Sequence, residues 1–86
     1  MTTRKLHNDL DRLRDEINHL AADDVESRNK LNQLISELEA KLEKPDEEND
    51  GLMVNLKDAI KHFEAEHPRA TAILNDIMVT LSNMGI

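Results

Sequence analysis

The sequence predicts an all-α fold in which four helices form two antiparallel hairpins of a small bundle. In the first half of the chain, leucine and isoleucine recur at steps of three and four residues, which places them on one stripe of a helix. A proline-containing acidic break then separates this half from a second half with similar spacing. A stripe this narrow has to be covered by another helix, so the pattern predicts packing of the coiled-coil type.

The first helix is expected over residues 3–20 and the second over residues 23–43. Asp23, with Glu26 three residues later, resembles a capping box at the start of the second helix. The short link at 21–22 requires the two helices to run antiparallel. The stripes of the two helices consist of Leu6, Leu10, Leu13, Ile17 and Leu20, and of Leu31, Ile35, Leu38 and Leu42.

Residues 44–50 combine a proline with several acids, and we interpret them as an exposed acidic connector. The third helix is expected over 50–66 and must end before Pro68, because a residue that precedes proline avoids α geometry. Pro68 suits the first turn of a fourth helix over 68–84. The whole chain is expected to form a single helical domain over 1–86.

The fourth expected helix carries only two charged residues, Arg69 and Asp76, and has a broad apolar face. Such a face usually contacts more than one neighbour, so this helix is either the centre of a bundle or in part a partner surface. In the second case Met78 and Met84 would be adaptable contacts. The residues expected in the core or in an interface are Leu6, Leu10, Leu13, Ile17, Leu38, Phe63, Ile73, Leu74, Ile77, Met78, Leu81 and Met84.

Composition limits the classes of function. A net charge of −7 argues against binding nucleic acid, which requires a basic face, and against docking on an anionic membrane. The chain has no cysteine, and no stretch of about 18 apolar residues that would span a bilayer. Charged residues follow Met1 where a signal peptide would be apolar, so we expect a cytoplasmic location.

Residues suited to catalysis are few. The four histidines are scattered along the sequence, and the serines lack the context of a nucleophile elbow. With two glycines in all, the chain has no phosphate-binding loop. We therefore expect no enzymatic activity and no cofactor.

Two Glu-x-x-His pairs, Glu16 with His19 and Glu64 with His67, have the spacing of ligands in di-iron helical bundles. Their placement is unfavourable, because His19 points away from the leucine stripe and His67 lies at a helix end beside Pro68. Chance pairing in an acid-rich chain is the better explanation, and no metal site is expected.

The acidic connector also resembles part of a calcium-binding loop. Asp46, Glu48, Asp50 and Gly51 occupy positions one, three, five and six of the EF-hand pattern. Position twelve needs a bidentate glutamate, but Lys57 stands there. A solvated acidic loop is the expected structure.

Two segments carry a family resemblance: Phe63-Glu64-Ala65-Glu66-His67-Pro68 and Leu81-Ser82-Asn83-Met84-Gly85-Ile86. They resemble a Phe-Glu-x-x-His-Pro junction and an Asn-Met-Gly-Ile end in an uncharacterised bacterial family of short all-helical proteins, classed as a domain of unknown function. The resemblance implies an all-helical domain in the bacterial cytoplasm. It brings no activity and no site residue.

A chain of 86 residues buries only about 60–65% of its unfolded surface, and pooling two copies increases that fraction. The sequence therefore predicts a non-enzymatic helical protein that acts through self-association, as a homodimer, or through another protein partner. The alternative is a metal- or ligand-binding bundle that uses the Glu-x-x-His pairs. A third possibility, an acidic regulator that neutralises a basic partner, rests on charge alone.

Overall fold

The computed structural model describes residues 2–44 and 50–85, and it confirms the predicted all-α class. Most of the expected acidic connector, including Asp46 and Glu48, lies outside the described residues. No strand occurs in the described part of the chain. The four helices are α1 (Thr2–His19), α2 (Val25–Glu43), α3 (Asp50–Phe63) and α4 (Pro68–Asn83).

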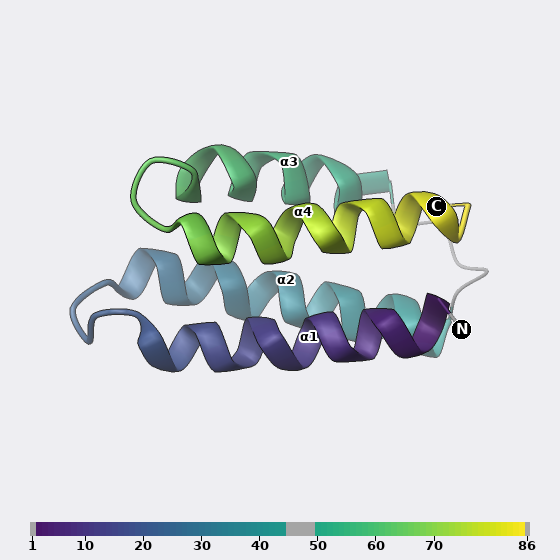
Figure 1. The fold of residues 1–86 in the computed structure, drawn as a ribbon, viewed down its shortest axis with the longest axis horizontal. Helices are drawn as coiled ribbons and strands as arrows, with labels where there is room; N and C mark the ends of the chain where they lie inside the picture. The colour runs from purple at the N-terminus through teal and green to yellow at the C-terminus, as the bar shows by residue number, and fades with distance from the viewer. Residues whose placement is uncertain (1, 45–49, 86) are drawn as a thin grey trace.

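The helices form a ring of four antiparallel neighbours (Figure 1). Each helix packs against the next one in the chain, and α4 closes the ring by packing against α1. The molecule measures 37 × 22 × 19 Å along its principal axes, so it is one helix long and two helices wide in each other direction. The α1–α2 and α3–α4 turns lie at one end of the bundle, and both chain termini lie at the other.

The core of this ring is formed within a single chain. All four helices contribute to it, and α4 buries its broad apolar face because α1 and α3 cover it from two sides. Of the residues expected in the core or in an interface, nine are buried, whereas Ile17, Met78 and Met84 are partly buried. The buried hydrophobic residues are Leu6, Leu10, Leu13, Leu20, Leu31, Leu34, Ile35, Leu38, Leu52, Leu56, Ala59, Phe63, Ala70, Ile73, Leu74, Ile77 and Leu81.

Helix α3 ends at Phe63, three residues earlier than the sequence predicted. The amides of Glu66 and His67 both donate to the carbonyl oxygen of Phe63, at 3.3 and 2.8 Å, and this closes a tight turn. His67 has φ −130° and ψ 72°, outside the α region, as a residue before Pro68 requires. Residues 64–66, which the sequence predicted to be helical, form this turn instead.

Burial makes a direct prediction for α4. Ile77 is fully buried, whereas Val79, two residues later on the same helix, is 59% exposed. We expect Ile77→Ala to lower the free energy of unfolding by about 2–5 kcal/mol, because it leaves a cavity in the core. Val79→Ala, the matched control, should change it by no more than about 0.5 kcal/mol. Urea unfolding followed by circular dichroism measures both, and equal effects would contradict the placement of α4.

Candidate functional site

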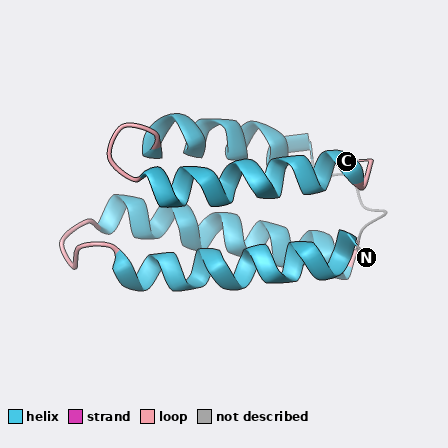
Figure 2. Cartoon of the chain, viewed as in Figure 1, coloured by secondary structure: helices cyan, strands magenta, loops and turns pink. Residues whose placement is uncertain are grey.

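The two short turns that connect the helices lie together at one end of the bundle (Figure 2). The α1–α2 turn spans 20–24 and the α3–α4 turn spans 64–67. Three of the four histidines, His19, His62 and His67, lie in these turns or within the last turn of the preceding helix. They are scattered in the sequence, but the antiparallel arrangement brings them to one end.

The N-cap of α2 is Asp24, and not Asp23 as the capping-box pattern predicted. Its carboxylate accepts a hydrogen bond of 3.2 Å from the backbone N–H of Ser27. The backbone N–H of Asp24 donates to the carbonyl oxygen of Ala21 at 3.0 Å, and this turn sets the position at which the helix begins. An aspartate therefore caps α2 as predicted, but it is Asp24 and not its neighbour Asp23.

His67 joins the two turns. Its Nε2 lies 3.4 Å from the carboxylate of Asp24, and its ring contacts Phe63 edge-on, with centroids 5.4 Å apart. Its carbonyl oxygen accepts from the backbone N–H and the hydroxyl of Thr71, both at 3.0 Å, at the start of α4. The Phe-Glu-x-x-His-Pro segment is therefore a corner that fastens α3 and α4 to the cap of α2.

These contacts affect the ionisation of Asp24. Hydrogen bonding by the side chain of Ser27 is the main cause that lowers the pKa of Asp24 below its ordinary value of 3.8. Desolvation opposes this effect, while the backbone N–H of Ser27 and the charge of His67 add to it. The carboxylate is thus held ionised as the cap of α2.

Ser27 also contacts a histidine, which sequence reasoning did not anticipate. Its hydroxyl lies 3.3 Å from Nε2 of His62, and so connects α2 with α3. Ser27 is buried, with 2% of its surface exposed, and the nearby carboxylate of Asp58 pairs with Lys30 at 3.5 Å. Among the described residues no further hydrogen bond to the His62 ring is found, so the contact does not form a catalytic triad there, and it links α2 with α3.

A carboxylate on α1 is buried at the same end. The side chain of Glu16 is 8% exposed, and its Oε1 lies 3.5 Å from Nε of Arg69, the second residue of α4. Glu16 was not among the residues expected in the core or in an interface. It is buried because α4 crosses α1 at this point and covers it.

Glu16 lines an open pocket of about 330 Å³ between the two turns, which we name the turn pocket. A volume of this size is at the lower end of the range for small-ligand sites. Its lining combines carboxylates, imidazoles and two apolar side chains. The lining residues are Glu16, His19, Leu20, Glu66, His67, Pro68 and Arg69.

The fold brings the two Glu-x-x-His pairs to one end without making them a metal centre. Glu64 is exposed, and His67 faces Asp24. Nδ1 of His19 lies 2.9 Å from the carbonyl oxygen of Asp15. Within residues 2–44 and 50–85, no group of three or more His, Cys, Asp or Glu side chains is arranged to hold a metal ion.

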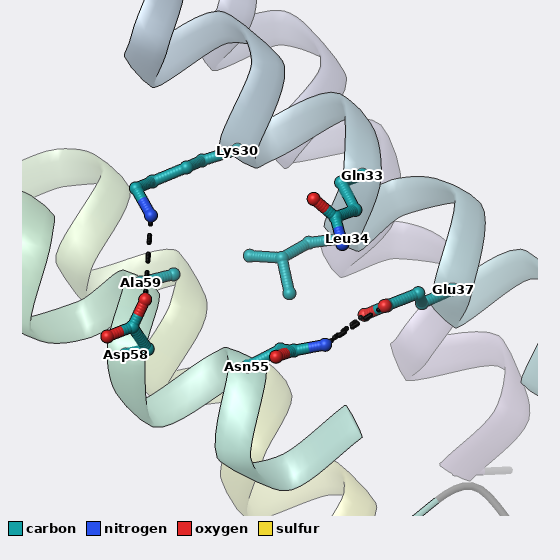
Figure 3. A pocket seen from close by; sticks show the side chains of 7 residues that line it. All are labelled: Lys30, Gln33, Leu34, Glu37, Asn55, Asp58 and Ala59. Atoms are coloured by element: carbon teal, nitrogen blue, oxygen red, sulfur yellow. Dashed lines mark hydrogen bonds and ion pairs between the residues drawn. The ribbon is translucent and has the colours of Figure 1, made fainter. Parts of the chain in front are cut away.

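A second pocket lies between α2 and α3 (Figure 3). Lys30 reaches Asp58 across it at 3.5 Å, and Nδ2 of Asn55 donates to Glu37 at 3.0 Å, while Leu34 lies between these two pairs. Its volume is about 60 Å³, room for a water or two and far below the volume of a ligand site. These polar pairs therefore act as contacts between the two helices.

A polar network between α1 and α4, centred on the buried carboxylate of Asp9, was not predicted from the sequence. The carboxylate of Asp9 is 2% exposed and lies 3.4 Å from Lys5 and 3.3 Å from Arg12. Arg12 continues to Asp76 on α4 at 3.0 Å. The hydroxyl of Thr80 lies 3.4 Å from Asp9 and 2.9 Å from the carbonyl oxygen of Asp76, so it has one proton for two acceptors.

The lowered pKa of Asp24 predicts a pH dependence of stability. Because its pKa is lower in the folded state, its stabilising contribution is complete above pH 3.8 and is lost as the pH falls through the folded-state value. Asp24→Asn keeps a capping side chain but removes the titration. We expect this variant to be less stable than the wild type at neutral pH, with the difference shrinking in acid.

Urea unfolding at several pH values measures this difference. Asp23→Asn is the matched control, since Asp23 is exposed and does not cap the helix. A constant difference between Asp24→Asn and the wild type at every pH would contradict the assignment of the cap.

Comparison with known proteins identifies the family but adds no described activity. No curated protein and no solved structure matches the chain. In the described part of the chain, no helix combines the length and the apolar character that a membrane span requires. Residues 6–86 match the family model of a domain of unknown function, DUF4404. The chain therefore belongs to this uncharacterised family.

Proposed function

We propose that the protein acts without catalysis, as a helical module that associates with a second copy of itself through the outer side of the α3–α4 hairpin. The observation that carries this proposal is an uncharged stripe along α4. Its exposed members are Ala72, Asn75, Val79 and Ser82. In a chain with 34% charged residues, an outward helix face without charge is unusual.

Both charged residues of α4 point away from this stripe, towards α1. Arg69 pairs with Glu16, and Asp76 pairs with Arg12. Val79, with 59% of its surface exposed, lies at the centre of what remains on the outer side. Charge depletion around an exposed apolar side chain is the compositional mark of the middle of a protein interface.

Partly buried apolar side chains extend the stripe towards α3. Asn55 and His62 bond to side chains of α2. Met53 lies two residues before Asn55, and Ile60 lies two residues before His62. This spacing places their side chains about 160° around the helix from the side that faces α2, and therefore on the flank that faces α4. By the same geometry Met78, two residues after Asp76, lies on the flank of α4 that faces α3. The partly buried side chains of Met53, Ile60 and Met78 therefore border the contact between α3 and α4.

A second copy is the partner that this surface fits best. In a two-fold symmetric contact the same patch serves both chains, and a patch without charge avoids the repulsion that two copies with a net charge of −7 meet elsewhere. Since the core is already closed within one chain, association is expected to be reversible and not required for folding.

The alternative of a metal-binding bundle is not favoured, because the described residues contain no group suited to hold a metal ion. A catalytic function likewise has no specific observation in its favour.

Val79→Glu tests the proposal. A two-fold contact would bring two added charges together in a buried centre, so we expect this variant to weaken association by at least about tenfold while unfolding as the wild type does. Val25→Glu is the matched control, because Val25 is 57% exposed and lies on α2, outside the proposed surface.

Sedimentation equilibrium over a range of protein concentrations measures the dissociation constant of each variant. A wild-type chain that stays monomeric up to millimolar concentration would overturn the proposal. Equal weakening by the two variants would also overturn it, since it would show a general effect of charge.

A further inference from the structure

We propose that the turn pocket binds a primary ammonium group, with the carboxylate of Glu16 as its anionic anchor. The pocket lies at the opposite end of the bundle from the chain termini, and it takes no part in the self-association proposed above. One lining side chain, Glu16, has a buried oxygen without a hydrogen-bond partner within the described residues.

The environment of Glu16 makes it the anchor of the site. It is more than nine-tenths buried, and its Oε1 is inaccessible to solvent without a hydrogen-bond partner in the described part of the chain. Arg69 lies 3.5 Å away, but its N–H does not have the geometry of a hydrogen bond, and its own side chain is 70% exposed. A buried carboxylate oxygen without a donor is costly, and a ligand that donates to it would remove that cost.

His19 and His67 already have polar contacts within the bundle. A backbone carbonyl can only accept, so Nδ1 of His19, 2.9 Å from the carbonyl oxygen of Asp15, donates to it. In His67, Nε2 faces the carboxylate of Asp24 at 3.4 Å. Glu16 is therefore the lining side chain whose buried polar atom still needs a partner within the described residues.

A primary ammonium group complements a buried carboxylate oxygen that lacks a donor. It carries a positive charge and three N–H donors, and it has no acceptor of its own. Leu20 and Pro68 line the same pocket and suit the methylene groups that such a cation carries. An anion fits less well, since Glu16 and Glu66 provide two negative charges against the one positive charge of Arg69.

Arg69 acts as the internal competitor in this arrangement. Its guanidinium lies next to the carboxylate that the ligand needs, and its exposed position allows it to move away. The proposal therefore makes opposite predictions for the two members of one ion pair: removing Glu16 abolishes the site, and removing Arg69 frees it.

The ammonium group could belong to a small alkylamine or to a lysine side chain of another protein. Both sources share the chemistry that the pocket recognises. N-butylammonium chloride represents the first source and Nα-acetyl-lysine amide the second. The Nε-acetylated form of the lysine compound retains the chain but lacks the charge.

The experiment is a titration followed by amide chemical shifts, with sodium chloride at equal ionic strength as the reference. We expect saturable shifts at Glu16, His19 and Arg69 with a millimolar or lower dissociation constant. Glu16→Gln should raise this constant at least about tenfold, because the charged acceptor is lost. Arg69→Gln should lower it about threefold, because the competitor is lost.

Glu39→Gln is the matched control. Glu39 pairs with Arg14 at 3.1 Å in a pocket at the other end of the bundle, but its side chain is 52% exposed, so it has no buried need for a donor. We expect this variant to bind as the wild type does. Equal weakening by Glu39→Gln and Glu16→Gln would overturn the proposal, since it would show attraction to overall charge.

Three further outcomes would overturn the proposal: shifts that do not saturate, weaker binding by Arg69→Gln, or equal binding of the Nε-acetylated compound. If Glu16→Gln fails to fold, Arg69→Gln still tests the proposal. The Arg69 side chain is exposed, so its replacement is expected to leave the fold intact. Tighter binding of the lysine compound than of butylammonium would indicate a protein-borne lysine, and equal or weaker binding a small amine. Either result supports ammonium recognition.

Discussion

The packing of α4 against α1 is the contact on which the rest of this structure depends. The two hairpins could each form from local sequence, but neither can cover the broad apolar face of α4 alone. Closing the ring buries Ile77 and Leu81 from a second side, and also places α4 over the carboxylates of Asp9 and Glu16. The core and both buried acids of α1 thus follow from one helix pair.

The two acids have different environments on the same helix. Asp9 pairs with Lys5 and Arg12, and Thr80 shares its one proton between Asp9 and the carbonyl oxygen of Asp76, so the cost of burying Asp9 is offset. Glu16 faces Arg69 at 3.5 Å, and its Oε1 has no hydrogen bond within the described residues. The first arrangement satisfies its acid within the bundle, and the second leaves an acceptor to which the proposed ligand could donate.

The number, order and approximate bounds of the helices could be predicted from the sequence, because leucine spacing, Pro68 and the short link are local signals. The cap was misplaced by one residue, because Asp23 and Asp24 are the same residue type and only the turn formed with Ala21 distinguishes them. The turn pocket could not be predicted, because Glu16 and Arg69 are distant in the sequence and meet only through the closed ring. Apolar periodicity indicates which face is buried, but not which polar side chains are buried along with it.

The placement of both termini at one end of the ring has a consequence for how the chain may be rearranged. The start of α1 and the end of α4 lie on neighbouring antiparallel helices, so a short peptide linker could join them (Figure 1). A circular permutant that is opened between α2 and α3 would keep all four helix seams and both short turns. We expect such a permutant to form the same bundle, because the contacts that close the ring are unchanged.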